Sequence, residues 1–422
     1  NVQIQREIHA RLEEYLDLRG LDPARPVGED LWEKTENAIC DIVEQLEADG
    51  GLPAGVSQET LVRDVLNEAL GLGPLEGLLQ DETVSQVLVN RPDRIYVVRN
   101  GATEPLGKVF SSDRAALNVV ARLLAPVGRK VDETTPVCDA RLRDGALLNV
   151  VVPPVAVFGP TFTLRKLQRS TWTLDSLVSQ GALSREMAEL LRTAVSNRRS
   201  VVVSGPAGAG KTALLGALVA AIRPQERVVT VEEVAEISPP QENVVALESR
   251  PGHGADGRAS LGVRDVLRNA LRMQPDRLVV GELRGPETLD LLQAMQTGHE
   301  GVITSINAGS PREALHRLES LALTSGVDLP TRALRAIISE AVQLLVQLAR
   351  YADGSVKVLQ VTEVGELQGD VISLQDVFYF QQESFDQAGH VRGRFSSTGY
   401  APRFYEDLRN RGVDVNMGIF HT

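Results

Sequence analysis

Cysteine is almost missing from this 422-residue chain, which contains only Cys40 and Cys138. Two cysteines cannot make a disulfide framework, and their spacing is unlike that of metal ligands. Long apolar runs are also missing, since the most apolar stretch, residues 147–159, contains an asparagine and two prolines. It falls short of the ~18 residues that a membrane-spanning helix requires. These absences favour a globular protein of a reducing compartment such as the cytosol.

Positive charge and aromatic side chains are scarce as well. The formal net charge is -12, and only 4% of the residues are Phe, Trp or Tyr. Broad binding to nucleic acid depends on clustered Lys and Arg and on stacking side chains. The composition therefore weighs against a general nucleic-acid binder, although a local basic channel is still compatible with it. No internal repeat and no low-complexity segment is present.

One glycine-rich segment carries the strongest functional signal. Residues 205–212, GPAGAGKT, fit the G-x-x-x-x-G-K-[ST] pattern of a phosphate-binding loop. The β-branched run Val201–Val203 precedes it and a helix-forming run, Leu214–Ile222, follows it. In that context we expect the loop amides and the helix N-terminus to face a polyphosphate. The alternative, a glycine-rich turn that binds no ligand, would not require this strand and this helix on either side. Lys211 is expected to reach the β- and γ-phosphates, and the Thr212 hydroxyl to bind Mg²⁺.

The pattern of apolar residues divides the chain into four parts. Residues 1–50 predict two helices, and residues 51–168 predict a smaller mixed α/β domain with a half-open antiparallel sheet. Residues 169–180 are expected to form a linker. Residues 181–422 alternate helices with strands that are apolar on both faces, which indicates a parallel sheet. Its strands are expected at 201–203, 228–231, 278–280, 302–306 and 343–346, with hairpin strands at 357–364 and 371–380.

Hydrolysis requires groups that position water and neutralise charge as well as a loop that holds phosphate. Glu282 follows the apolar strand 278–280, and Glu232 and Glu233 follow the strand 228–231. Open α/β sheets place their ligands at these strand ends. His299 precedes the strand 302–306 between glycines, and the structural and the catalytic interpretation of this histidine are both open. Solvated glutamates would be the alternative for the three carboxylates.

The order of the motifs resembles that of the secretion and pilus ATPases of the type II/type IV superfamily, most closely the CpaF/TadA branch. The similar segments are GLGPLE (71–76), VLVN (87–90), GRKVDE (128–133), DARL (139–142), NALRM (269–273), PDR (275–277), GELRG (281–285), AMQTGH (294–299), SPREAL (310–315) and GDV (369–371). The resemblance covers nearly the whole chain.

This resemblance implies a RecA-like motor domain, homohexameric assembly, and a cytoplasmic location at the inner face of the cytoplasmic membrane. It implies ATP and Mg²⁺ as cofactors and an inner-membrane platform protein as partner, with no nucleic acid. Glu282 would then activate water, Glu232 and Glu233 would act on Mg²⁺ and water, and His299 would sense the γ-phosphate. Arg141 and Arg165, which alone would be taken for surface arginines, would reach the phosphates from the N-terminal domain. The expected phosphate-binding residues are Gly205, Pro206, Ala207, Gly208, Ala209, Gly210, Lys211, Thr212 and Ala213, and the expected metal ligands are Thr212 and Glu233.

Several positions depart from that family's pattern. Ala207, Ala209 and Ala213 stand where hydroxyl side chains are usual, and Glu233 stands where an aspartate is usual. Asn307 replaces a second histidine, and asparagine can donate a hydrogen bond but cannot become a cation. Three functions therefore remain open: a motor ATPase for a pilus or a secretion system, a nucleotide-gated ring with weak hydrolysis, and a nucleic-acid translocase. The acidic composition weighs against the third.

Overall fold

The structure, a computed structural model, describes residues 2–16, 28–52, 57–99, 102–166, 172–250, 260–386 and 389–421. It divides the chain into two compact units, Asn1–Gln168 and Arg169–Thr422. Each unit has its own core, and each is described by itself. The first residues of the expected linker, 169–171, lie outside the described residues.

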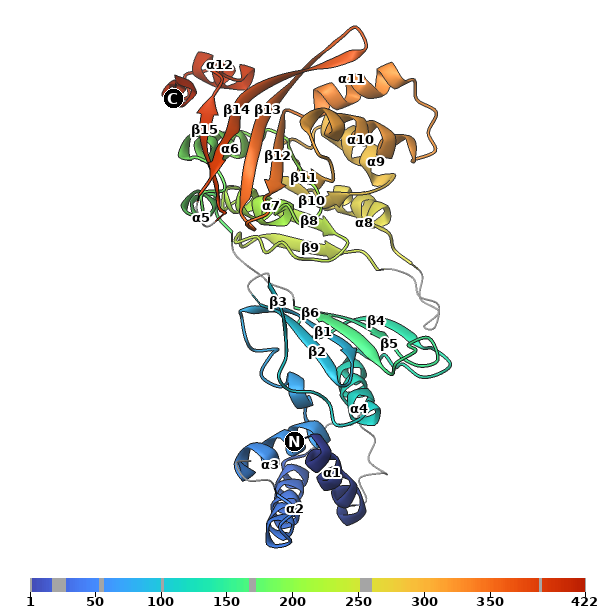
Figure 1. Ribbon diagram of the computed structural model, residues 1–422. Coiled ribbons are helices and arrows are strands. Elements are labelled where there is room, and N and C mark those ends of the chain that lie inside the picture. The colour runs from blue at the N-terminus through green and yellow to red at the C-terminus, as the bar shows by residue number, and fades with distance from the viewer. Residues whose placement is uncertain are drawn as a thin grey trace. The chain divides into compact units, whose positions relative to one another are not determined.

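The first unit begins with three helices that share one core (Figure 1). They are α1 (Val2–Leu16), α2 (Glu29–Ala48) and α3 (Gln58–Leu70). Ile8 and Leu12 of α1 are buried with Ile39 of α2 and Val65 of α3, because apolar residues recur on one face of each helix. The sequence assigned α3 to the α/β domain, so the boundary expected at residue 50 separates helices that pack together.

An antiparallel sheet of six strands completes the first unit, in the order β3-β2-β1-β6-β5-β4. Val87, Leu148 and Leu164 alternate with more exposed residues and are buried with Val119 of α4 (Asp113–Leu124). The expected antiparallel α/β unit is therefore present, with β4 as a strand that the sequence analysis did not predict. The strands are β1 (Val84–Arg91), β2 (Arg94–Arg99), β3 (Ala102–Pro105), β4 (Val137–Arg141), β5 (Leu147–Val151) and β6 (Thr161–Arg165).

The second unit is built on a sheet of nine strands in the order β15-β14-β13-β12-β7-β11-β10-β8-β9. The strands from β12 to β9 are parallel, and β12 to β15 form an antiparallel extension. The strands are β7 (Val201–Ser204), β8 (Val228–Glu232), β9 (Val244–Glu248), β10 (Arg277–Leu283), β11 (Ile303–Ile306), β12 (Leu344–Arg350), β13 (Val356–Gln368), β14 (Val371–Phe385) and β15 (Val391–Ser397).

Helices cover both faces of this sheet (Figure 1). Val201 and Val203 of β7 pack with one set of helices, whereas Val202 packs with the other set, because successive strand residues face opposite sides. The first set is α5 (Leu174–Ser179), α6 (Arg185–Ser196), α7 (Lys211–Ala220) and α12 (Arg403–Asn410). The second set is α8 (Val263–Ala270), α9 (Glu287–Gln296), α10 (Pro311–Leu323) and α11 (Thr331–Ala341). The predicted α/β motor with a parallel sheet is confirmed.

Three expectations need correction. Residues 174–179 of the expected linker form α5, whose Leu174 and Leu177 are buried in the core of the second unit. The helix after the phosphate loop starts at Lys211 rather than at Leu214. The strands β9 and β15 were not predicted. Among the described residues, no helix combines the length and the apolarity that a membrane span requires.

Candidate active site

The glycine-rich loop connects the buried strand β7 to the N-terminus of α7. Gly210 precedes α7 with a φ of 88°, a left-handed conformation that favours glycine. No side chain caps this helix within the described part of the chain, so its first amides are available to an external acceptor. A helix N-terminus of this kind attracts phosphate. The local sequence thus builds a strand, a glycine-rich loop and a helix in the order that the motif predicted, and the binding of phosphate there stays a prediction.

The loop is packed tightly from below. A Cβ atom on Gly205 would lie 3.0 Å from the Ala209 Cβ and 3.0 Å from the Leu348 carbonyl oxygen, so larger residues are disfavoured. Ala209 itself is fully buried, whereas Thr212 is exposed. The side chain of Ala209 therefore belongs to the packing beneath the loop. The exposed Thr212 hydroxyl remains available to a ligand.

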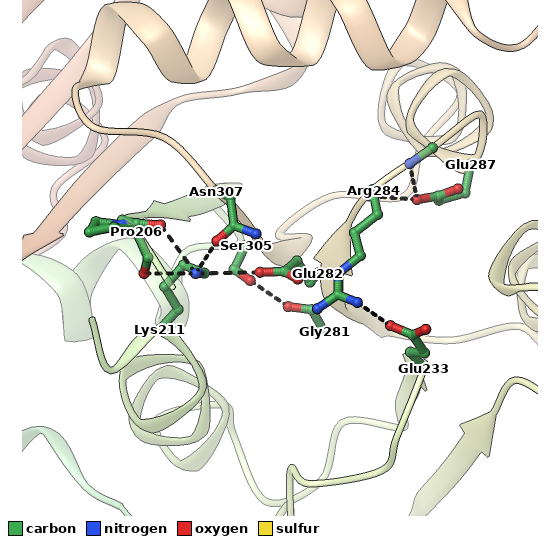
Figure 2. A network of polar contacts seen from close by, with 11 residues as sticks. Pro206, Lys211, Glu233, Gly281, Glu282, Arg284, Glu287, Ser305 and Asn307 are labelled. Carbon is green, nitrogen blue, oxygen red and sulfur yellow. Dashed lines mark hydrogen bonds and ion pairs between the residues drawn. The ribbon is translucent and has the colours of Figure 1, made fainter. Parts of the chain in front are cut away.

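Lys211 is held by oxygen atoms from three strand ends (Figure 2). Its Nζ donates hydrogen bonds to the carbonyl oxygens of Gly205 and Pro206, at 3.1 and 3.2 Å, and to Asn307 Oδ1 at 2.5 Å. Glu282 Oε1 lies 3.4 Å from the same nitrogen. The side chain of Lys211 is 8% exposed. A phosphate oxygen that reached this ammonium group would form a charge-assisted hydrogen bond with it.

Glu282 and Asn307 reach Lys211 because β7, β11 and β10 are neighbours in the parallel sheet. Asn307 follows β11 directly, and Glu282 is the penultimate residue of β10, so it does not follow the strand as the sequence suggested. The pairing of β10 with β11 shifts register between Val280 and Leu283, and Ser305 Oγ donates to the Gly281 carbonyl at 2.6 Å. Such irregularities commonly redirect a side chain at an active site.

Arg284 links two of the predicted acidic residues (Figure 2). Its Nε donates to Glu282 Oε2, and its Nη1 donates to Glu233 Oε2. Hydrogen bonding to Glu282 raises the pKa of Arg284, and the charges of Glu282 and Glu233 act in the same direction. The guanidinium therefore stays charged and offsets part of the negative charge of both carboxylates. Arg284 stands two positions after Glu282 in the GELRG segment, a position to which the sequence alone assigned no role.

Glu232 faces a different set of groups. It is 4% exposed, and its carboxylate accepts hydrogen bonds from the amides of Glu236 and Ile237, with Oε2 at 3.0 and 3.1 Å. These contacts fix the loop after β8. Glu233, by contrast, contacts Arg284 at the edge of the site. The structure thus separates the two neighbouring glutamates, with Glu232 in a structural position.

The structure does not bring His299 to Lys211. Residues that precede a parallel strand lie at its amino end, and β11 separates His299 from Asn307 by roughly 10 Å of extended chain. The carbonyl of Gly301 accepts from Arg277 Nη1 at 3.0 Å, and Arg277 begins β10. His299 Nδ1 is buried without a partner among the described residues. The expected contact of His299 with the γ-phosphate of its own subunit is therefore not supported by the geometry.

Arg141 and Arg165 belong to the first unit. Both pair with Leu147, from opposite sides of β5, so they lie at one level of the sheet and on one face. The buried Leu148 and Leu164 face the other side. The structure brings the two arginines together as a pair. Their predicted action on phosphates stays a prediction.

Two further side chains fix the backbone around the site. Arg350 Nε donates to the carbonyl oxygen of Gly208 at 2.6 Å, across 142 positions of sequence. Glu287 Oε1 accepts from the amides of Arg284 and Gly285, both at 2.8 Å. A carboxylate near the start of a helix is a recognisable signal for such a turn, whereas the contact of Arg350 depends on the sheet order.

The residues at this site fit a magnesium ion that is bound together with a nucleotide. Within the described residues, no group of three or more His, Cys, Asp or Glu side chains could hold a metal by itself. Mg²⁺ commonly uses one or two carboxylates, waters and substrate phosphates rather than a full protein cage. The Thr212 hydroxyl and the Glu233 carboxylate provide oxygen ligands of that kind.

The family model described as "Type II/IV secretion system protein" matches residues 68–396. The chain belongs to this family. A protein of Mycobacterium tuberculosis described as a conjugal transfer protein is 35% identical over 316 residues, 74% of this chain and 89% of its own length. The type IV secretion system protein PtlH of Bordetella pertussis is 32% identical over 309 residues, 67% of this chain and 90% of its own.

The fold agrees with this membership of the secretion and pilus ATPase superfamily. The crystal structure of the pilus retraction motor PilT with bound ADP superposes with a TM-score of 0.51 at 19% identity. The match covers 71% of this chain and 80% of the PilT chain. At that level of identity the comparison supports the fold alone: an N-terminal domain and a RecA-like ATPase domain.

Proposed function

We propose that this chain hydrolyses ATP and drives, as a homohexamer, a type IV pilus of the Tad/Flp kind or a type II-like secretion system. The observation that carries the proposal is the convergence of Lys211 and Glu282, whose Nζ and Oε1 lie 3.4 Å apart at the carboxyl ends of β7 and β10. Phosphoryl transfer to water uses a lysine that binds the phosphates and a residue that positions the attacking water, and these two side chains can supply both.

The chain's own groups divide the work of hydrolysis. The backbone N–H groups of residues 205 and 207–213, at the N-terminus of α7, bind the β- and γ-phosphates, and Lys211 neutralises part of their charge. Thr212 and Glu233 would hold Mg²⁺, which supplies further charge neutralisation when it is bound. Glu282 orients a water molecule and accepts its proton. Asn307 fixes the ammonium of Lys211 while this happens.

Arg141 and Arg165 complete the proposed mechanism from the first unit. Arginine is always charged and can bind phosphate with two N–H groups, so a pair of guanidinium groups can stabilise the developing charge. We propose a cytoplasmic location at the inner face of the cytoplasmic membrane, with an inner-membrane platform protein as partner. Family membership and the names of the relatives that act in secretion and conjugal transfer support this proposal.

Steady-state phosphate release tests the catalytic part. Lys211→Ala should abolish turnover, because the loop loses the charge that holds the γ-phosphate. Glu282→Gln should retain nucleotide binding and lose turnover, because the amide cannot accept a proton. Lys108→Ala is a matched control, since Lys108 lies in the first unit, is 52% exposed and pairs with Asp64. Persistent turnover in Lys211→Ala would refute the assignment.

A second function is a nucleotide-gated ring with weak hydrolysis. Two residues favour it. Asn307, which contacts Lys211, cannot become a cation beside the phosphates, and Ala213 has no hydroxyl group to donate a hydrogen bond to them. Phosphate release from the purified hexamer, with and without the cytoplasmic loop of a platform protein, separates the two functions. A nucleic-acid translocase would require stimulation by DNA, which we do not expect from an acidic chain.

A further inference from the structure

Arg284 occupies an unusual position between the acidic groups of the site. Its guanidinium contacts one oxygen of Glu282 and one oxygen of Glu233, which come from β10 and from the end of β8. The other oxygen of Glu282 lies 3.4 Å from Lys211 Nζ. Each oxygen of Glu282 is therefore engaged by a cation. The negative charge of Glu282 is therefore shared between two cations of the chain itself.

The turn that carries Arg284 does not depend on its guanidinium. Glu287, which is 5% exposed, accepts hydrogen bonds from the amides of Arg284 and Gly285 and thereby fixes the backbone after β10. The Arg284 side chain is 62% exposed and that of Glu233 is 59% exposed. A side chain so exposed adds little to folding. Its contacts therefore need an explanation other than stability.

The chemistry of the two carboxylates supplies that explanation. Glu233 is an oxygen ligand of the kind that Mg²⁺ prefers, and Glu282 is proposed to hold the attacking water. A guanidinium and a magnesium ion are both cations that satisfy such oxygens, so they compete for the same pair. The guanidinium of Arg284, two residues after Glu282, therefore contacts the carboxylates in the place where a magnesium ion would.

We propose that Arg284 is a latch residue that holds Glu282 and Glu233 together and must be displaced when Mg²⁺ enters with the nucleotide. This inference rests on the proposed function, because it assumes a magnesium–nucleotide complex at the Lys211 loop. The latch sets the concentration of Mg²⁺ at which the site becomes competent. It acts through the two glutamates, so Arg284 is a positioning residue rather than a catalytic one.

The test measures binding of the fluorescent nucleotide mant-ADP to the full chain while Mg²⁺ is varied. In Arg284→Gln the half-saturating Mg²⁺ concentration should fall about three- to tenfold, since two exposed ionic contacts no longer compete. Arg284→Lys should give a smaller decrease, because an ammonium reaches one carboxylate more readily than two. Thermal unfolding of each variant checks that the fold is intact, and Arg284→Lys provides a conservative second variant.

Arg403→Gln is the matched control. Arg403 is also an exposed arginine of the second unit that pairs with a carboxylate, since its Nη1 lies 2.7 Å from Glu366 Oε1 and its side chain is 59% exposed. The half-saturating Mg²⁺ concentration of this variant should change less than twofold. An equal decrease in Arg403→Gln would mean that the loss of any exposed arginine–carboxylate contact has this effect, and it would overturn the latch.

Other outcomes are equally decisive. An unchanged or raised Mg²⁺ requirement in Arg284→Gln would overturn the proposal, because the arginine then does not compete with the metal. The measurement needs no turnover. If the wild type binds mant-ADP with Mg²⁺ but releases no phosphate, the proposed function fails while the latch is still tested. If the wild type hydrolyses ATP and Arg284→Gln keeps its Mg²⁺ dependence, the latch alone fails.

Discussion

Replacing Asn307 by histidine should make nucleotide affinity depend on pH. Asn307 Oδ1 lies 2.5 Å from Lys211 Nζ, so an imidazole at this position would sit next to a buried ammonium group. An imidazolium there would be repelled by Lys211 in the protein without nucleotide. Bound phosphates would offset that repulsion. The variant should therefore take up a proton when nucleotide binds.

The distance in the structure gives the size of the effect. Two unit charges about 4 Å apart interact by about 4 kcal/mol at an effective dielectric constant of about 20, and 1.36 kcal/mol corresponds to about one pKa unit. Partial screening by solvent reduces the expected pKa shift of the histidine to about two units. The pKa of the introduced histidine would then lie near 4.5 without nucleotide and near the ordinary value of about 6.5 with it. Between pH 7.5 and 5.5 the affinity should rise roughly five- to tenfold, since the bound protein holds more protons.

The assay is titration of mant-ADP at several pH values, reported as the ratio of the wild-type Kd to the variant Kd. Because both proteins bind the same nucleotide, the effect of pH on mant-ADP itself cancels in this ratio. Asn307→Leu is the control, because it loses the amide without adding a titratable group, and its ratio should stay flat. A flat ratio for Asn307→His would refute the reasoning, and so would an affinity that falls as the pH decreases.

Two further changes test the packing of the second unit. Arg277 is fully buried, and its Nε donates a hydrogen bond to Glu226 Oε2 at 2.9 Å. Arg277→Ala should therefore lower the free energy of unfolding, measured by urea denaturation, by about 3 kcal/mol, because it leaves Glu226 without this partner. A loss below about 1 kcal/mol would contradict this expectation. Burial raises the pKa of the Glu363 carboxyl above its ordinary 4.5, so the folded protein binds this proton more tightly and loses stability as the pH rises from 4.5 through the raised value. Glu363→Gln should remove that slope; unfolding curves that keep the same pH dependence in both proteins would contradict the assignment.

The loop and the order of its flanking elements could be predicted because the signal is local. A glycine pattern, an apolar strand before it and a helix after it lie within a short stretch of sequence. Glu282 could be predicted for a related reason, since it stands at the end of an apolar strand in a parallel sheet. The contact of Asn307 with Lys211 could not, because it depends on β11 lying between β7 and β10.

The errors have physical causes as well. His299 was expected at the phosphates because it adjoins a strand of the sheet, but a residue before a parallel strand lies at the edge opposite the loop. The strand β9 is an edge strand whose residues are only partly buried or exposed, so it lacks the continuous apolar run that identified the central strands. Arg350 gave no local signal, because its partner Gly208 lies 142 positions away. The role of Arg284 was missed because its second partner, Glu233, follows a different strand.

The common register of Arg141 and Arg165 has a mechanical consequence. Both stand directly opposite Leu147 of β5, Arg141 from β4 and Arg165 from β6, which places their Cα atoms roughly 10 Å apart, two strand spacings. A slip of one residue in either ladder would turn one guanidinium toward the hydrophobic interior. The sheet therefore holds the two positive charges at a fixed separation. Any movement of the sheet that brings one of these arginines to a phosphate moves the other arginine with it.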